Sequence, residues 1–449
     1  MSFPKDFIWG AAAASYQIEG AAFEDGKKAS VWDMLAHSPG KIWDKYPADT
    51  ACDHYHRYKE DVKLMAEIGL PAYRLSISWP RVLPDGTGKV NEKGLDFYDK
   101  LIDELCANNI QPWVTLFHWD FPQALWLKGG WLNRESADWF AEYVKVIVNK
   151  LSDRVSHWMT INEPQCYIGG HYGGDLAPAM PYLFPDALTA AHNTLLAHGR
   201  AFQAIRGESK STSLIGAAPV GVTAVPVSDS KKDIEAVRKY MFSVCKKDFN
   251  SNTWFADPMI LGEYPKDGLE LFKEDLPEFP ADDMKVIKQP LDFYGANIYN
   301  GRLVKHHPEK GFENVQRGPG PELTTMGWRV TPESLYWGPK MLYERYKLPI
   351  VITENGIANM DWVHLDGKVH DPQRIDFLTR YLGEFKRAIA DGLPALGYFH
   401  WSIMDNFEWR RGFSQRFGLI HVDYTSYKRT LKDSAYWYSD VIKSNGANI

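Results

Sequence analysis

The chain has 449 residues and carries 51 basic and 57 acidic side chains, which gives a formal net charge of −6. With 45% hydrophobic and 24% charged residues its composition is that of an ordinary globular protein, and the acidic balance argues against a nucleic-acid-binding protein. No apolar run reaches the roughly 18 residues of a membrane helix. The four cysteines are scattered, which favours a reducing compartment, so we expect a cytoplasmic protein without membrane contact.

Eight short apolar runs, spread along the whole chain, predict β-strands. Their hydrophobic residues hardly alternate with polar ones, as in parallel strands that are buried on both faces. In chain order the predicted strands are Phe7–Ala13, Ala72–Ser76, Pro112–Phe117, His157–Ile161, Leu214–Ala218, Phe293–Ile298, Ile350–Thr353 and Leu396–His400.

Helical patterns occupy the stretches between these runs. A helix before the fourth strand has an apolar stripe at Phe140, Val144, Ile147 and Leu151. Thr331–Pro332 is expected to begin a helix that continues toward Tyr346. A third helix is predicted to begin after Asp371, the expected N-cap, with Pro372 in its first turn, and to end before Gly392.

Eight strand–helix units in an uninterrupted chain predict a (β/α)8 TIM barrel, with extended βα loops that account for the length beyond about 250 residues. We expect residues 1–449 to form a single catalytic domain. The alternative, a doubly wound sheet, would carry a glycine-rich turn after its first strand, but there Gly10 is followed by four alanines. P-loop and GxSxG motifs are also missing from the sequence.

Polar residues follow or end seven of the predicted strands, where a barrel gathers its catalytic groups. They are Gln17 and Glu19, Arg74, His118–Trp119–Asp120, Asn162–Glu163, Asn297–Ile298–Tyr299, Glu354–Asn355 and His400–Trp401. Two glutamates directly follow apolar strands, and a carboxyl pair in an aromatic cleft is suited to cleaving glycosidic bonds. Such a pair needs one protonated acid and one charged nucleophile. Arg74 and Tyr299 are expected to keep one glutamate charged.

Residues within and beyond these segments suit sugar binding. Flat faces for pyranose rings are offered by Trp119, Trp328, Trp401 and Trp409, and hydrogen bonds to hydroxyls by Gln17, His118, Asn162 and Glu408. Cys166 lies three residues after Glu163 and is expected to serve packing. The glycines of 169–174 predict a flexible rim.

The motifs resemble those of the family 1 glycoside hydrolases, and they keep family order over almost the whole chain. The matching segments are FIWGAAAASYQIEG from Phe7, YRLSISWPR from Tyr73, LFHWD from Leu116, TINEP from Thr160, IVITENG from Ile350, NFEW from Asn406 and RFGL from Arg416.

The resemblance implies a role for each matched residue. Glu354 would be the nucleophile that forms a covalent glycosyl-enzyme, and Glu163 the acid that later becomes the base, with retained configuration. The remaining implied residues contact the sugar or orient the nucleophile. Gln17, His118, Asn162, Glu408 and Trp409 would bind the sugar hydroxyls, Trp119, Trp401 and Phe417 would line its site, and Trp328 would support the leaving group. Arg74 and Tyr299 would orient Glu354, with Asn297 as a further supporting residue.

Two positions bear on specificity. Glu408 stands where relatives that cleave 6-phosphosugars differ, and its negative charge is expected to repel a phosphate. Many relatives have an aromatic residue two positions after the acid, whereas this chain has Gln165. This departure leaves the leaving-group side open.

We therefore expect a retaining β-glucosidase that acts on aryl and alkyl β-glucosides and on short oligosaccharides such as cellobiose, with β-galactosides and β-fucosides as further substrates. A transglycosylase would use the same intermediate and stays open on sequence grounds. A non-catalytic sugar-binding protein is disfavoured because both glutamates are present. We assign no metal and no cofactor, the expected partner is a small-molecule β-glucoside, and the oligomeric state is open.

Overall fold

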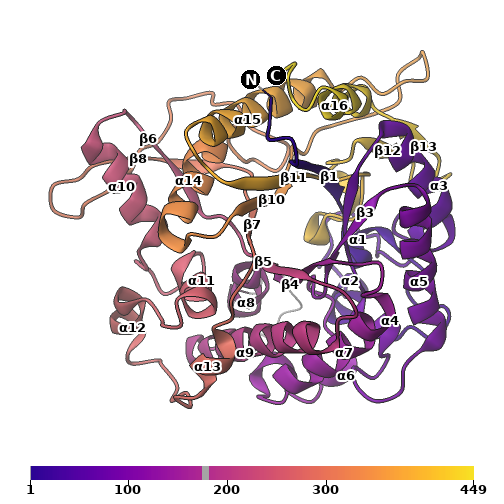
Figure 1. Cartoon of the computed structure of the whole chain (residues 1–449), viewed down its shortest axis with the longest axis horizontal. Helices are drawn as coiled ribbons and strands as arrows, with labels where there is room; N and C mark the ends of the chain where they lie inside the picture. Colours follow the sequence, from indigo (N-terminus) through magenta and orange to yellow (C-terminus); the bar gives the residue numbers. More distant parts are fainter. Residues whose placement is uncertain (1, 174–181) are drawn as a thin grey trace.

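A barrel of eight parallel strands forms the centre of the computed structural model, which describes residues 2–173 and 182–449 (Figure 1). Around the barrel the strands run in the order β5-β4-β3-β2-β1-β11-β10-β7. All eight predicted strands are confirmed, with ends within two residues of those expected. Their bounds are β1 (Ile8–Ala12), β2 (Ala72–Ser76), β3 (Gln111–Thr115), β4 (His157–Asn162), β5 (Leu214–Ala218), β7 (Tyr294–Asn297), β10 (Ile350–Asn355) and β11 (Ala395–Trp401).

The barrel closes where β5 meets β7. A parallel bridge joins Val220 to Asn297 just beyond the end of β5. The two strands approach so closely that a side chain at Gly295 would place its Cβ 2.5 Å from the carbonyl oxygen of Ala217. Glycine is therefore required at this position, and the predicted (β/α)8 barrel is confirmed.

Helices surround the barrel. The longer ones are α3 (His54–Ile68), α5 (Glu92–Ala107), α7 (Ser136–Leu151), α9 (Phe184–Glu208), α10 (Lys231–Phe242), α14 (Ser334–Tyr346), α15 (Pro372–Ala390) and α16 (Asp433–Lys443). Shorter helices lie between strands, namely α1 (Ser15–Ile18), α2 (Val31–Ala36), α4 (Trp79–Val82), α6 (Gln123–Trp126), α8 (Pro164–Gly173), α11 (Thr253–Ile260), α12 (Lys266–Phe272) and α13 (Asp283–Ile287), with 3₁₀ turns at Gly130–Leu132 and Trp409–Ser414.

The three predicted helices are confirmed, apart from one capping contact. The stripe of α7 is fully buried, α14 begins shortly after Thr331–Pro332, and α15 begins at Pro372 and ends before Gly392. Asp371 stands at the N-cap position of α15 as expected, but its side chain makes no capping hydrogen bond, because the carboxylate binds the guanidinium of Arg374 and the hydroxyl and amide of Ser434. Gly169 to Gly173 belong to α8 instead of a loose rim, and Gly174 lies outside the described residues.

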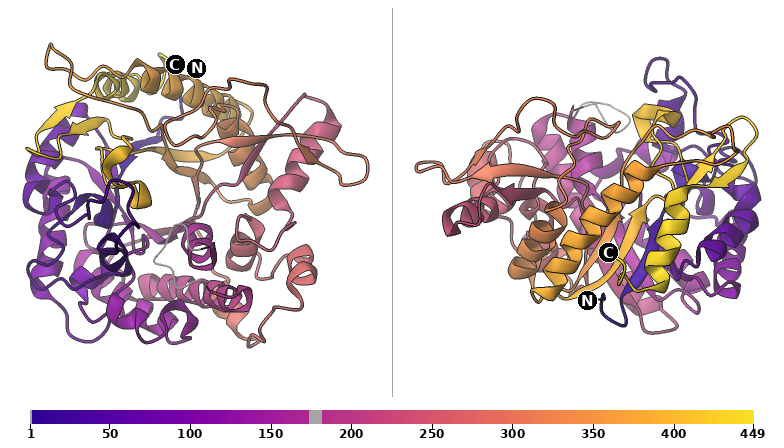
Figure 2. Two further views of the ribbon diagram at one scale, coloured as in Figure 1. Left: turned by 180° about the vertical axis from the view of Figure 1, so that it is seen from behind. Right: turned by 90° about the horizontal axis from the view of Figure 1, so that it is seen from above.

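Two small sheets were not predicted. β6 (Thr223–Pro226), β8 (Gly301–Lys305) and β9 (Glu313–Asn314) form one, and β12 (Ile420–Val422) pairs antiparallel with β13 (Arg429–Leu431). Together with α10, β6 and β8 project to one side of the barrel (Figures 1 and 2). β8 is partly exposed, so it lacks the continuous apolar run by which the buried strands are recognised.

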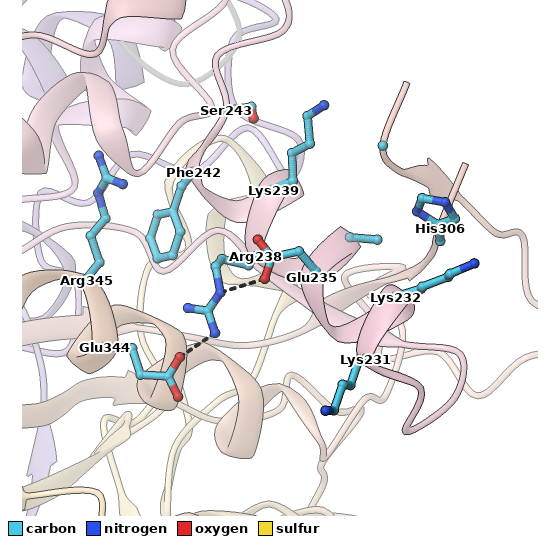
Figure 3. A pocket seen from close by; sticks show the side chains of 12 residues that line it. Lys231, Lys232, Glu235, Arg238, Lys239, Phe242, Ser243, His306, Glu344 and Arg345 are labelled. Atoms are coloured by element: carbon cyan, nitrogen blue, oxygen red, sulfur yellow. Dashed lines mark hydrogen bonds and ion pairs between the residues drawn. The ribbon is translucent and has the colours of Figure 1, made fainter. Parts of the chain in front are cut away.

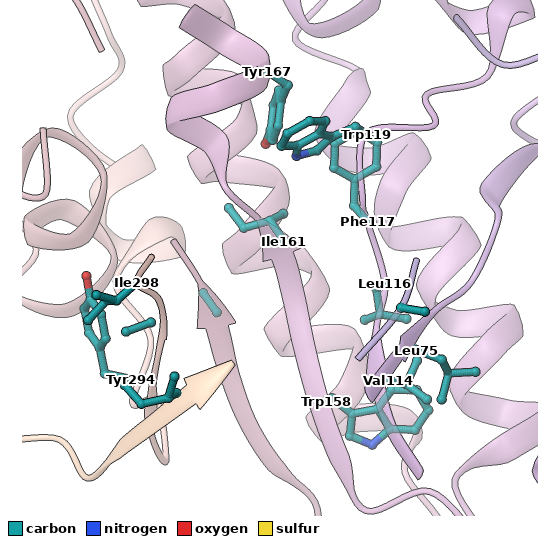
Figure 4. Packing of buried hydrophobic residues seen from close by; sticks show 14 of the residues in the cluster. Leu75, Val114, Leu116, Phe117, Trp119, Trp158, Ile161, Tyr167, Tyr294 and Ile298 are labelled. Atoms are coloured by element: carbon teal, nitrogen blue, oxygen red, sulfur yellow. The ribbon is translucent and has the colours of Figure 1, made fainter. Parts of the chain in front are cut away.

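Side chains of the barrel strands alternate between two cores. Trp113, Phe293 and Phe399 meet inside the barrel, where the ring of Trp113 lies 5.6 Å from that of Phe293 and 5.0 Å from that of Phe399. The next residue along β3, Val114, packs outward with Trp158 into the layer beneath the helices (Figure 4). This packing fixes the strands, and with them the polar residues at their carboxyl ends.

Candidate active site

Both glutamates predicted from strand ends line a single pocket of about 320 Å³. Glu163 follows β4 directly and Glu354 lies near the end of β10. Eleven of the fourteen predicted site residues line this pocket. They are His118, Trp119, Glu163, Asn297, Tyr299, Trp328, Glu354, Trp401, Glu408, Trp409 and Phe417. The other three, Gln17, Arg74 and Asn162, are buried behind the wall and bind residues that line it.

Glu354 is held by two donors, one on each carboxylate oxygen. Nη1 of Arg74 lies 2.6 Å from Oε1, and the Tyr299 hydroxyl donates to Oε2 at 2.7 Å. Burial raises the pKa of Glu354, while the charge of Arg74 and both hydrogen bonds oppose that rise. Since Glu354 alone of the two glutamates is ion-paired among the described residues, it is the first to ionise.

Glu163 has neutral neighbours. The side-chain amide of Asn297 donates to its Oε1 at 2.8 Å, and the Cys166 thiol also hydrogen-bonds to it. Burial and the negative charge of Glu354 raise the pKa of Glu163 to about 7. Its backbone has φ +47°, a left-handed conformation that is costly for a residue with a side chain. The site thus holds one charged carboxylate beside one that is half protonated near neutral pH.

A network of amides joins the two carboxyl groups. Oδ1 of Asn162 accepts from Nη2 of Arg74 at 2.6 Å and from Nδ2 of Asn297 at 3.0 Å. Its own Nδ2 lies 3.3 Å from Nε2 of His118. Burial and the nearby Arg74 hold the pKa of His118 well below its usual range, so this imidazole is neutral. Asn162 therefore presents its amide between the two glutamates with its orientation fixed.

Aromatic rings form the walls of the pocket. Trp119 and Trp409 stack with centroids 4.5 Å apart, and both have positive φ angles, +78° and +49°. The ring of His118 is nearly parallel to that of Trp401, at 5.8 Å. Such left-handed conformations persist only where surrounding structure imposes them, as at ligand-binding sites.

Glu408 departs from the expectation of a charged group. Burial, together with the charges of Glu354 and Glu163, raises its pKa to about 8. At neutral pH the carboxyl group is therefore mostly protonated, and the expected charge repulsion of a 6-phosphate is weak. Oε1 of the adjacent Gln17 is buried and has no partner among the described residues, while its Nε2 donates to the carbonyl of Phe407 at 2.9 Å.

Sequence reasoning missed the outer part of the pocket. Most of these unpredicted residues belong to the insertion between β5 and β7 or to the loop after β9. They include Val220, Gly221, Val222, Thr223, Tyr240, Asn250, Asn300, Arg302 and Met326. No strand-end position marks them in the sequence. Cys166 also lines the pocket beside Glu163, although its expected role was packing.

The described residues contain no cluster of three or more His, Cys, Asp or Glu side chains placed to hold a metal ion. Within residues 2–173 and 182–449, each helix is too short or too polar to cross a membrane.

Comparisons with known proteins agree with this geometry. The model of glycosyl hydrolase family 1 matches residues 1–447. A 1,4-beta-D-glucan glucohydrolase of Thermotoga neapolitana is 47% identical, over 99% of both chains. A bifunctional beta-D-glucosidase/beta-D-fucosidase of Bifidobacterium breve is 41% identical over 100% of this chain and 99% of its own. The structure of a beta-glucosidase from Thermotoga maritima in complex with glucoimidazole superposes with a TM-score of 0.91, at 47% identity, over 99% of each chain.

Proposed function

The chain belongs to glycosyl hydrolase family 1 and is a retaining β-glucosidase; we propose that Glu354 is its nucleophile and Glu163 its acid and base. One observation carries this assignment. Of the two glutamates in the pocket, Glu354 alone is paired with a cation, and its charge keeps a proton on Glu163 near neutral pH. This separation of protonation states is what double displacement requires.

In the first step a carboxylate oxygen of Glu354 bonds to the anomeric carbon while the bond from that carbon to the leaving oxygen breaks. Glu163 gives its proton to the leaving oxygen, so the aglycone departs as a neutral alcohol. In the second step Glu163, now a carboxylate, takes a proton from water as the water oxygen attacks the anomeric carbon and frees Glu354. The two inversions release the β-sugar, and we expect carboxyl groups about 5–5.5 Å apart.

The surrounding residues support binding of a terminal glucose. Asn162, fixed by Arg74 and Asn297, offers its amide to the 2-hydroxyl, where a hydrogen bond strengthens in the transition state. Deeper in the pocket, Gln17, His118, Glu408 and Trp409 would bind the remaining hydroxyls. Trp401 would form the floor, Trp119 and Phe417 the walls and Trp328 the platform for the leaving group.

A protonated Glu408 supports a neutral sugar, because it can both donate to and accept from hydroxyls. The relatives' names extend the substrate range we propose to short β-glucans and to β-fucosides. We also propose a cytoplasmic location, since Cys52, Cys106, Cys166 and Cys245 are all unbridged.

The test is the stereochemistry of hydrolysis, followed by NMR on an aryl β-D-glucoside. We expect β-glucose to appear first and to convert to the α-anomer only by mutarotation. A 2-deoxy-2-fluoro-glucosyl inhibitor should label Glu354, identified by peptide mass spectrometry. Initial release of α-glucose, or a label on another residue, would overturn the assignment.

A further inference from the structure

The active-site pocket continues outward into a second pocket of about 550 Å³. Five residues line both pockets, namely Tyr240, Asn250, Asn300, Arg302 and Trp328. The Trp328 ring lies 5.1 Å from the ring of Tyr299, whose hydroxyl binds Glu354. Trp328, the residue expected to support the leaving group, lines both pockets, so we place the second pocket on the leaving-group side.

This second pocket is strongly cationic, although the whole chain has a net charge of −6. Lys246, Arg302, Arg317 and Arg329 line it, and none of the described lining residues is acidic. None of these four cations forms an ion pair with a carboxylate of residues 2–173 or 182–449; Arg302 instead hydrogen-bonds to Tyr240. We call this group of four cations and the space they line the cationic pocket.

Two arginines of the cationic pocket hold unused hydrogen-bond donors. Nε of Arg317 and Nη1 of Arg329 are buried, and neither has a partner among the described residues. Both side chains are only half-buried, so the rest of each guanidinium faces the pocket, and an anion that binds there stabilises a charge that the protein leaves without a carboxylate partner. The planar guanidinium matches a carboxylate with two parallel hydrogen bonds.

Arg329 is positioned by a hydrogen-bonded turn, whereas Arg317 lies in the irregular segment that follows β9. The turn before Arg329 is closed by hydrogen bonds of 2.8 Å from the Thr324 amide to Trp328 O and from the Gly327 amide to Thr324 O. An antiparallel bridge joins Leu323 to Arg329. The ring of Trp328, which lies near Tyr299, and the adjacent Arg329 are thereby held in the same turn.

A neighbouring basic cavity differs from the cationic pocket because its arginines form ion pairs. It measures about 680 Å³ and is lined by α10, but Arg238 there pairs with Glu235 and Glu344 (Figure 3). Arg345 pairs with Asp257. Its arginines are neutralised by the protein, whereas those of the cationic pocket are not.

We propose that the cationic pocket is a leaving-group site for anionic aglycones, and that the enzyme prefers β-glucosides whose leaving group carries a carboxylate. The carboxylate binds Arg317 and Arg329, while Asn314 and Gln316, which line the same space, offer hydrogen bonds to hydroxyls. Two sources share this chemistry, a carboxylated phenol and an acidic sugar. The proposal rests on the proposed β-glucosidase function.

The experiment compares kcat/KM for 4-carboxyphenyl β-D-glucoside and its neutral methyl ester, and for β-1,4-linked glucosyl-glucuronic acid and cellobiose. The ratio of anionic to neutral substrate is measured in the wild type and in the Arg317→Gln/Arg329→Gln variant. Because each ratio is compared between enzymes, intrinsic differences in leaving ability cancel. We expect the ratio of anionic to neutral kcat/KM to fall on the order of tenfold in the variant, for the phenol pair, the disaccharide pair or both.

Lys231→Gln/Lys232→Gln is the matched control, since it removes two positive charges from the neighbouring cavity, and its ratio should equal that of the wild type. In the unmodified enzyme, ionic strength of about 1 M should lower the ratio, because the Debye length shrinks to about 3 Å. A ratio unchanged by both the double substitution and salt would overturn the proposal. Failure to cleave either the neutral or the anionic glucosides would instead contradict the β-glucosidase function.

Discussion

At the scale of single residues, the two glutamates differ in what surrounds them. Glu354 has a guanidinium at 2.6 Å, whereas the donors to Glu163 are the neutral side chains of Asn297 and Cys166. Both are buried, so the pair cannot ionise together without cost. One proton is therefore retained, and the neighbours place it on Glu163.

This predicts a pH profile with a defined sign. The acid must be protonated, so kcat/KM for an aryl glucoside should fall as pH rises through about 7, the pKa of Glu163. Burial raises this pKa most and the charge of Glu354 raises it further, so removing that charge should lower the pKa of Glu163. A ¹³C NMR titration of Glu163 in Glu354→Gln measures the shift.

As a control, Asp85→Asn removes a carboxylate of an exposed ion pair and should leave the titration unchanged. A Glu163 pKa that stays near 7 in Glu354→Gln would show that the nucleophile's charge does not hold the proton.

Strand-end positions were enough to find Glu163 and Glu354 from the sequence, and the family motifs added Glu408, Trp409 and Phe417. They could not give the protonation of Glu408, which depends on burial and on two other charges brought together only by the fold. Arg317 and Arg329 were also missed, because no periodicity marks loop residues whose function depends on the residues around them.

At the scale of elements, the ends of β10 and β11, which carry Glu354 and Trp401, lie side by side in the barrel. Gly356 directly follows β10, and a Cβ there would lie 1.9 Å from the carbonyl oxygen of Trp401, the last residue of β11. Backbone atoms cannot yield without moving a strand end. The spacing between Glu354 and Trp401 thus depends on the absence of a side chain at Gly356.

Gly356→Ala should therefore displace Trp401 and lower kcat/KM on the order of 100-fold, the cost expected of a shift of about 1 Å. Gly383→Ala is the matched control. It lies within α15 with no atom within 4 Å of the new Cβ, and alanine favours the helix. Steady-state kinetics of the two variants decide the matter, and equal activity would contradict this account of the strand contact.

Sequence patterns predicted the barrel strands but not β8 and β9. The eight barrel strands are buried on both faces, so their apolar runs are distinctive. β8 and β9 are partly exposed and short, and β9 has only Glu313 and Asn314. Pairing with a distant partner creates these strands, and local sequence does not record it.

At the scale of the whole molecule, a buried ionic cluster joins segments from the last third of the chain. Nζ of Lys432 lies 2.5 Å from Asp361 and 2.7 Å from Asp405. Each aspartate also pairs with one arginine, Asp361 with Arg374 and Asp405 with Arg416. Asp405 also accepts from the amide of Gly418 at 3.0 Å. The cluster thus anchors both ends of the loop that carries Glu408, Trp409 and Phe417.

Lys432→Met should lower the free energy of unfolding by about 3–5 kcal/mol, because it leaves two buried carboxylates short of a cation. Lys28→Met is the control, since the Lys28–Asp85 pair is exposed and worth at most about 1 kcal/mol. Urea denaturation followed by tryptophan fluorescence compares them. Similar losses for the two variants would show that the buried cluster is not a structural anchor.

Double displacement as proposed here requires Glu354 to attack the anomeric carbon while Glu163 supplies the proton. Hydrolysis of an activated aryl β-D-glucoside by Glu354→Ala, with and without azide, tests both roles. We expect almost no turnover by the variant alone, and turnover restored by azide with α-glucosyl azide as product, because the small anion occupies the space of the missing carboxylate. A variant that retains the wild-type rate without azide, or a β-glucosyl azide product, would contradict it.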